Sequence, residues 1–286
     1  LRKGKAWFLQ AVDGEYNLTI VEELPAGADR NPAWRFSNLS KGQINLSPSN
    51  ILTASLVVNQ FRSDYAGLSP FDPQETTVSL DNSAYWFAAR DQHFLSGGAL
   101  LETGVALSEF RESVRPLGER TYTLTPEGRR GNYFAAAEAR AGRLQAIANL
   151  FLPPLAGYGR HFVKAGFDVD RVTHRESVQR RPMQILRDDG TLSREIAFTG
   201  AAPFSRSNFE AGGYVQDRWS VSDRVTLEPG IRLDWDAVVR DVLVSPRFAS
   251  TLLLTRDGDT KLAWGIGLYH DATYLVFLNQ ALTGRR

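Results

Sequence analysis

Residues 225–235 read VTLEPGIRLDW, and this stretch decides the fold. Apolar or proline side chains occupy every second position from Val225 to Trp235, and the positions between them are polar or glycine. Successive side chains of a β-strand point to opposite faces of a sheet, so this period of two predicts a strand with one apolar and one polar face. The polar face carries both signs of charge, on Glu228, Arg232 and Asp234.

Two further stretches repeat the alternation, Phe162–Val169 and Lys261–His270. Charges of both signs, mixed with glycines, indicate a water-filled or plugged lumen rather than a simple solvated surface. Six charged residues on these polar faces are therefore the candidate lumen-lining residues, and they are Lys164, Asp168, Asp170, Glu228, Arg232 and Asp234.

The connections between alternating stretches are short and long in strict turn. Short turns fall near residues 47–50, 95–98, 153–159, 222–224 and 256–259, whereas longer polar stretches span 25–32, 62–82, 111–131, 177–208 and 236–246. Hairpins with short turns at one end and long loops at the other are typical of outer-membrane barrels. Because surface loops carry specificity on a rigid scaffold, we expect the loop at 177–208 to contact a ligand.

Eleven strands are predicted, several of them longer than a usual soluble strand. Their ranges are 5–22, 34–47, 50–61, 83–95, 98–111, 131–152, 159–175, 209–221, 225–236, 247–255 and 260–270.

The stretch Ala135–Phe151 is rich in alanine, which by itself favours a helix. Its neighbours on both sides require a hairpin, so we predict a strand. The apolar side of the alternation changes near Gly142, and a glycine bulge there would explain the change.

Composition excludes several classes of protein. The chain has 286 residues, a net charge of +1 and no cysteine, which excludes disulfide scaffolds, thiolate metal sites and cysteine nucleophiles and gives no reason to expect a nucleic-acid partner. No apolar run approaches the roughly 18–20 residues of a membrane-spanning helix. No signal peptide is visible, and the chain begins with Leu1, so we expect an internal part of a larger protein.

A soluble β-sandwich would also alternate, and two features favour a membrane barrel over it. No segment supplies a second covering layer for eleven long strands. Aromatic residues lie near predicted strand ends, as in an interfacial girdle, at Trp7, Phe8, Phe94, Phe151, Trp219 and Tyr269.

Motifs for catalysis or metal binding are not recognisable. The four histidines form no metal-binding spacing, and no nucleophile elbow or phosphate loop occurs. Asp168 and Asp170 share a face, but little else supports a paired-carboxylate active site. We therefore expect no enzyme activity, no cofactor and no metal.

The segment from Gly212 to Asp271 carries a combination of motifs that resembles the barrel of TonB-dependent outer-membrane receptors. Aromatic-x-Gln-Asp-x-Trp is followed by Gly-x-Arg-x-Asp, a Pro-Arg-Phe strand and a strand with alternating glycines. The positions that match most clearly are Tyr214, Gln216, Asp217, Trp219, Gly230, Pro246 and Arg247.

This resemblance implies an all-β fold, an antiparallel up-and-down transmembrane β-barrel of about 22 strands whose lumen is closed by an N-terminal plug domain. Residues 1–286 would form about half of it, without signal peptide, plug or C-terminal strands, since the chain stops at Gly284-Arg285-Arg286. Such a receptor lies in the lipid of a Gram-negative outer membrane. It imports a siderophore, cobalamin, metal complex or oligosaccharide with energy delivered through TonB.

Two other interpretations stay open from the sequence. One is a passive outer-membrane pore or adhesin barrel without a plug, because the strands alone do not distinguish it from a receptor. The other is a secreted multi-stranded protein that binds glycans through aromatic residues on a soluble sheet.

Overall fold

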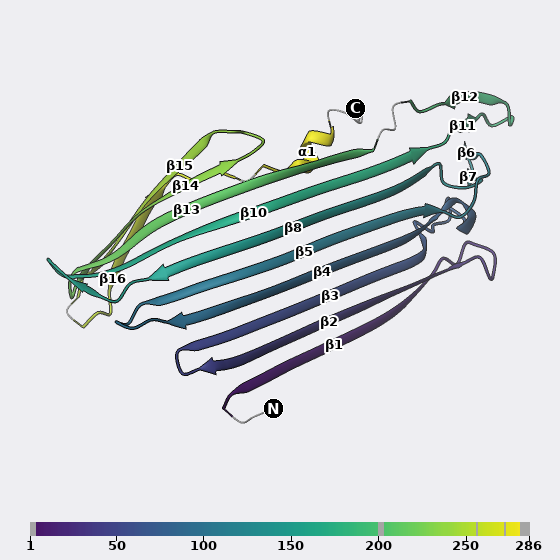
Figure 1. The fold of residues 1–286 in the computed structure, drawn as a ribbon. Coiled ribbons are helices and arrows are strands. Elements are labelled where there is room, and N and C mark those ends of the chain that lie inside the picture. The colour runs from purple at the N-terminus through teal and green to yellow at the C-terminus, as the bar shows by residue number, and fades with distance from the viewer. Residues whose placement is uncertain (1–3, 200–202, 256, 272, 281–286) are drawn as a thin grey trace.

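The computed structural model describes residues 4–199, 203–255, 257–271 and 273–280. Long strands form one antiparallel sheet in which each strand lies beside the next in chain order (Figure 1). They are β1 (Ala6–Ile20), β2 (Arg30–Ser47), β3 (Asn50–Ala66), β4 (Val78–Phe94), β5 (Leu100–Pro116), β8 (Ala135–Phe151), β10 (Arg160–Arg180), β13 (Phe204–Ser222), β14 (Val225–Asp236), β15 (Val242–Leu253) and β16 (Lys261–Gly267). All eleven predicted strands are confirmed. The two-residue strand β9 (Leu155–Ala156) pairs with the start of β10.

The sheet is not closed. Strands β1 and β16 form its two edges, and among the described residues each pairs on one side only. Among the described residues the one α-helix is α1 (Leu275–Gln280), and a short 3-10 turn, η1, spans Gln74–Thr76. No helix within the described ranges is long and apolar enough to cross a membrane. The predicted lack of a C-terminal strand, which rests on residues 284–286, lies outside the described residues.

Several strands extend farther toward the long loops than the sequence predicts. Strand β10 has 21 residues and continues to Arg180 rather than ending at 175, and β13 begins at Phe204 rather than 209. Backbone pairing between β8 and β10 continues through these extra residues. The backbone pairing of these strands therefore continues beyond the residues in which polar and apolar side chains clearly alternate.

The predicted strand at β8 is confirmed, but the predicted bulge at Gly142 is not. Its pairing with β5 and β10 is continuous, with Gly142 opposite Glu109 on one side and Thr173 on the other. The bulge prediction is therefore wrong. One face of β8 carries an apolar side chain, Leu144, in one part of the strand and a charged side chain, Arg140, in another. Because the polarity changes along this face, the apolar positions change in the sequence although the backbone pairing does not.

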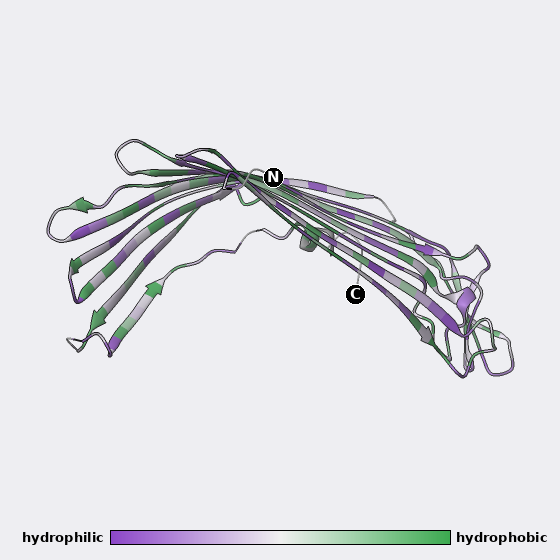
Figure 2. Cartoon of the chain, turned by 90° about the horizontal axis from the view of Figure 1, so that it is seen from below, coloured by the Kyte–Doolittle hydropathy of each residue, from purple (hydrophilic) through white to green (hydrophobic). Residues whose placement is uncertain are grey.

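The sheet is arched, and its two faces differ in polarity. Figure 2 shows the arch with α1 beneath it. Helix α1 contacts β10 and β13, and Thr273 donates a hydrogen bond to Asp236 at 2.8 Å, so the polar face that carries the candidate charges is the concave one. The convex face carries exposed apolar side chains, such as Phe167 at 55 % and Ile231 at 42 % exposure.

Buried apolar side chains are few in the described part of the chain: Tyr122, Ala135, Met183, Phe204 and Leu275. A soluble protein with eleven long strands would bury its apolar side chains in a core, whereas this chain leaves apolar side chains such as Phe167, Val215 and Ile231 exposed on the convex face. Such a surface is suited to contact with the hydrocarbon of a lipid bilayer.

A second, small sheet lies at the end of the long loops (Figure 1). Its order is β12 (Leu192–Ile196), β11 (Met183–Leu186), β6 (Tyr122–Thr125) and β7 (Gly128–Arg130). The parallel pairing of β6 with β11 joins the loop after β5 to the loop after β10. The segment 177–208, predicted as a loop, is thus partly ordered into strands and anchored to another loop.

The predicted aromatic girdle is wrong in part. Alternation places Phe8 and Trp219 on the convex face but Trp7, Phe94 and Phe151 on the concave face, because register fixes the side of each residue. Tyr269 follows the end of β16, where the Arg247 guanidinium lies 4.5 Å from its ring centre.

Candidate functional site

The candidate site is the concave wall formed by β8, β10, β13, β14 and β15. All six predicted lumen-lining residues lie on this face. Register places Lys164, Gln216, Gly230 and Arg247 opposite one another in a single row across four strands. Three positions of the sequence motif that are far apart in the chain are thus neighbours in space.

A three-residue ion-pair network spans the next two rows of the wall. Arg232 Nη2 lies 3.0 Å from an oxygen of Asp168 and 2.7 Å from an oxygen of Asp234. The guanidinium lies over Gly212, where a Cβ atom would come within 2.3 Å of Arg232 Nη2. The glycine therefore makes room for the side chain that joins β10 to β14.

A second pair is more deeply buried. The Asp170 side chain is 1 % exposed, and its Oδ1 accepts a 2.7 Å hydrogen bond from Arg143 Nε, while Gln145 donates to Oδ2 at 3.4 Å. Asp168 and Asp170 are thus each bound to a different arginine. This arrangement holds the wall together and leaves neither carboxylate positioned as a free general acid or base.

Two of the cavities in the described part of the chain lie beside the candidate charges of this wall. The larger, of about 860 Å³, is lined by Lys164, Tyr214, Gln216, Glu228, Arg247 and Tyr269 among others. Tyr214 donates a hydrogen bond to Asn149 Oδ1 at 2.9 Å, and Lys164 Nζ lies 5.9 Å from the Tyr214 ring centre. The smaller, of about 190 Å³, contains His270, whose Nδ1 lies 3.1 Å from Ser245 Oγ.

The remaining motif positions lie on the convex face. Asp217 Oδ2 lies 2.6 Å from His161 Nδ1, and Trp219 donates its indole N–H to Tyr158 O at 2.8 Å, at the short-turn end of the sheet. Pro246 lies opposite Ile231 in the apolar face. The motif therefore combines wall, rim and outer-surface positions rather than marking one site.

Sequence reasoning missed Arg143, although its alternation with Leu144 places it on a polar face. No group of three or more possible metal ligands occurs among residues 4–199, 203–255, 257–271 and 273–280. The wall offers paired charges, hydroxyls and amides to a polar ligand or to another protein segment.

Sequence comparison matches no family model and no curated protein. Comparison with solved structures finds the same fold. The outer membrane transporter YddB from Escherichia coli superposes with a TM-score of 0.62 at 17 % identity, covering 89 % of this chain and 34 % of that one. The siderophore receptor PirA from Acinetobacter baumannii gives 0.62 at 15 % identity, covering 93 % and 38 %.

The pyoverdine outer membrane receptor FpvA from Pseudomonas aeruginosa, solved with pyoverdine bound, gives a TM-score of 0.64 at 10 % identity and covers 89 % and 41 %. This chain thus spans well under half the length of the structures that it matches. Its fold is that of part of the barrel wall of such outer-membrane receptors, an antiparallel up-and-down sheet that is not closed.

Proposed function

We propose that residues 1–286 form about half of the barrel of an outer-membrane receptor that imports a scarce substrate with energy delivered through TonB. The observation that carries the proposal is the division of one long sheet into a convex face that exposes apolar side chains such as Phe167, Val215 and Ile231 in its middle and a charged concave wall. A barrel embedded in lipid with a filled lumen needs this division. The fold shared with outer-membrane receptors supports it.

A ferric siderophore is the substrate class that we propose. Three of the structures that share the fold are named as receptors for siderophores, pyoverdine or ferric catecholates. The small sheet of β6, β7, β11 and β12 holds the loop at 177–208 above the wall, where a ligand would first meet the protein. The barrel wall then serves transport without any enzymatic step.

The charged wall also suits a plug domain from elsewhere in the protein. Glu228, Lys164 and Arg247 border the larger cavity and offer both signs of charge to an inserted domain. The alternative is an open pore, and one observation favours it: Arg232 and Arg143 already pair within the wall itself.

The test uses the full-length protein in its own cell. We expect it to fractionate with the outer membrane. Its deletion should abolish uptake of one labelled ferric siderophore, and a protonophore should abolish the same uptake in wild-type cells. The purified protein in planar bilayers should show no open-channel conductance. Steady conductance with uptake unaffected by the protonophore would support the pore, and recovery in the soluble periplasm would refute both.

A further inference from the structure

A polar patch lies on the convex face of β1 and β2, among side chains that are otherwise apolar. Gln10 in β1 lies directly opposite Ser40 in β2, and Asn38 is the next β2 residue on the same face. These three residues are the polar patch. Apolar side chains of the same face flank it along β2 and lie opposite it on β3, and they are Trp34, Phe36, Ile44, Leu56 and Val58.

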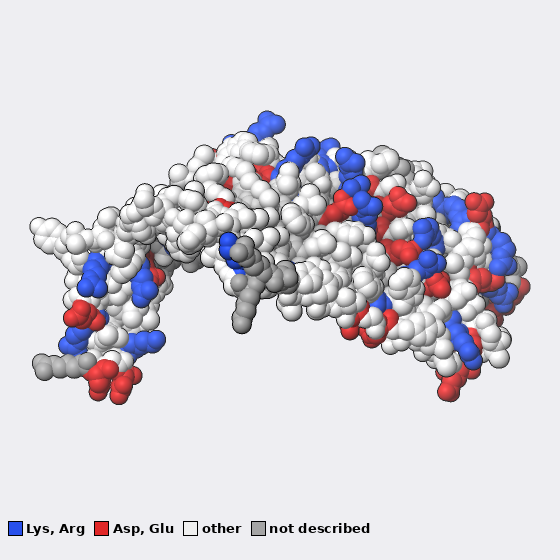
Figure 3. Space-filling model, turned by 60° about the horizontal axis from the view of Figure 1, so that its bottom comes forward, with Lys and Arg blue, Asp and Glu red and all other residues white. Residues whose placement is uncertain are grey.

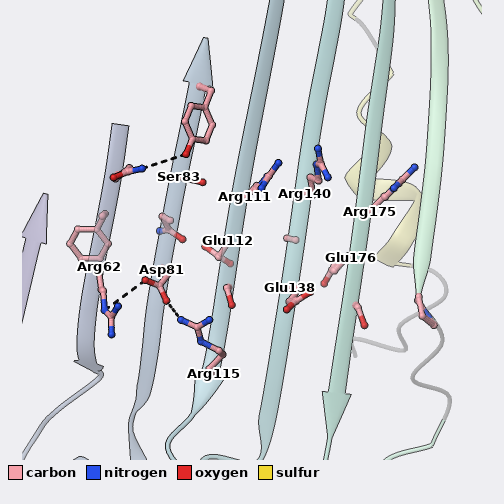
Figure 4. A pocket seen from close by; sticks show the side chains of 18 of the residues that line it. Arg62, Asp81, Ser83, Arg111, Glu112, Arg115, Glu138, Arg140, Arg175 and Glu176 are labelled. Carbon is pink, nitrogen blue, oxygen red and sulfur yellow. Dashed lines mark hydrogen bonds and ion pairs between the residues drawn. The ribbon is translucent and has the colours of Figure 1, made fainter. Parts of the chain in front are cut away.

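The polar patch lies near the middle of the depth that a bilayer would cover on β2. Trp34 lies opposite Arg62, and Arg62 forms an ion pair with Asp81 in the charged rim at the long-loop end (Figure 4). Ser40 is six residues along β2 from Trp34 and seven from Ser47, where the strand ends at the short turn. At about 3.3 Å per residue and a tilt of about 40°, these separations are roughly 15 Å and 18 Å of depth, so Ser40 lies near the middle of a hydrocarbon core of about 30 Å.

The other face of β1 and β2 shows which side meets water. Within residues 6–20 and 31–47, every charged residue lies on the concave face, and these are Asp13, Glu15, Arg35 and Lys41. Figure 3 shows charges of both signs gathered toward the long-loop end, beyond a middle region where charges are sparse. The convex face of β1 and β2 therefore meets hydrocarbon, and the polar patch is an exception on it.

The side-chain amides of the polar patch are not satisfied by the chain itself. The Ser40 hydroxyl lies 2.8 Å from Gln10 Oε1 and 3.0 Å from Asn38 Oδ1, and its single hydrogen serves one of these oxygens at a time. In the described part of the chain, neither the Gln10 nor the Asn38 amide nitrogen donates a hydrogen bond. Hydrocarbon supplies no acceptor, so covering these amides with lipid costs free energy that a polar partner at the same depth would remove.

Two glycines on the same face flank the polar patch. Gly42 lies opposite Phe8, and Gly14 lies opposite Phe36. A Cβ atom at Gly14 would meet nothing within 4 Å, and one at Gly42 would meet only the Trp7 carbonyl oxygen, at 3.9 Å. Packing within the described residues therefore requires neither glycine. A glycine inside a strand weakens the strand and often marks a place where another backbone approaches closely.

The surface around Gly14 can pair with a copy of itself. A groove of about 540 Å³ lies there, and its lining on the convex face includes Gly14, Tyr16, Trp34, Phe36 and Gln60. Tyr16, which is 66 % exposed, projects beside the open space over Gly14. The face thus offers a hollow and a projecting ring, and the polar patch offers both amide donors and amide oxygens. A contact about a two-fold axis needs both halves on one surface, and an axis along the membrane normal places the polar patch of one copy beside that of the other at the same depth.

We propose that the convex face of β1 and β2 binds a second copy of this protein within the membrane. The amide groups of Gln10 and Asn38 then pair with the same groups of the other copy, and Gly14 and Gly42 let the two sheets approach closely. Amide side chains and small residues serve in this way between other membrane-embedded segments. The inference rests on the membrane placement in the proposed function, although not on the substrate or on TonB.

The test cross-links single cysteines in the full-length protein, in intact outer membranes, with a short membrane-permeant bis-maleimide. Any other cysteine of the full-length protein is first replaced. Ser40→Cys places a thiol in the polar patch, and Leu107→Cys is the matched control, because exposed Leu107 lies in the same row of the convex face on β5. We expect a product of twice the monomer mass, containing this protein alone, from Ser40→Cys and none above background from Leu107→Cys. Adding Gly14→Leu should lower cross-linking at Ser40→Cys to the level of the control, because leucine fills the hollow in which the second copy packs.

Asn38→Leu is a second variant, because an apolar side chain suits lipid and leaves the barrel folded while it removes an amide from the contact. It should also lower cross-linking at Ser40→Cys. Each variant is first checked for a folded barrel in outer-membrane fractions. Failure of the wild-type protein to reach the membrane would overturn the proposed function as well. Membrane-inserted protein that cross-links equally at Ser40→Cys and Leu107→Cys, that cross-links at Ser40→Cys to a different protein, or that is unaffected by both Gly14→Leu and Asn38→Leu would overturn only the contact with a second copy.

Discussion

Replacing Ile231 by arginine should destabilise the full-length barrel strongly. Ile231 is the seventh of twelve residues in β14 and lies on the convex face. Six residues at about 3.3 Å each place it roughly 20 Å along the strand from the short-turn end. A tilt of about 40° reduces this to roughly 15 Å of depth, half of the hydrocarbon core of about 30 Å.

An arginine at the bilayer midplane on the lipid-facing side of a barrel costs about 2–4 kcal/mol. Gln216 lies at a similar depth on the opposite face, beside the larger cavity. Gln216→Arg should cost less, about 1 kcal/mol, because its guanidinium reaches water and only Lys164, directly opposite it, repels it.

The assay is equilibrium unfolding of the full-length protein from phospholipid vesicles in urea, followed by tryptophan fluorescence. Midpoints and slopes are compared for the wild type and the two variants, because an unchanged slope shows that stability alone has changed. The face assignment fails if Ile231→Arg is no more destabilising than Gln216→Arg.

Three further changes test particular contacts. Arg143→Met should destabilise the barrel by about 3 kcal/mol by leaving the buried Asp170 carboxylate unpaired, and adding Asp170→Asn should recover much of that loss in a double-mutant cycle. Gly212→Val should cost about 1–3 kcal/mol in the same urea titration, because its side chain displaces the Arg232 guanidinium, whereas Gly212→Ala should cost less. Burial raises the pKa of the Tyr122 hydroxyl in the loop sheet, so its stabilising effect is complete below about pH 10 and is lost as the pH rises through the raised pKa; in a tyrosinate absorbance titration, Tyr122→Phe should have one late-titrating group fewer than the wild type.

The strands could be predicted from sequence because alternation is a local property. Ten of the eleven are predicted from their own residues, whereas the alanine-rich β8 is predicted as a strand because its neighbours require a hairpin. The prediction failed where polarity alone was used to infer register. At Gly142 a change of polarity along one face of the strand was interpreted as a bulge. The aromatic residue Phe94 was assigned to the lipid-facing side, although its position in the alternation places it on the concave face.

The contacts of the site were less accessible to prediction. Asp168 and Arg232 are 64 positions apart, and their contact depends on the pairing registers of β10, β13 and β14. The loop sheet was missed because β6 and β11 are short and pair in parallel across two different loops. Such pairing leaves no periodic signal in either strand.

Single-cysteine labelling along β14 tests the central claim most directly. This chain contains no cysteine, so each introduced thiol in it reports on its own position. One cysteine at a time is placed from Leu227 to Trp235 in the full-length protein and exposed, in intact outer membranes, to a membrane-impermeant maleimide. The account predicts labelling at the even-numbered concave positions and protection at the odd-numbered convex ones. Equal labelling at both sets, or stronger labelling at the odd-numbered positions, would contradict it.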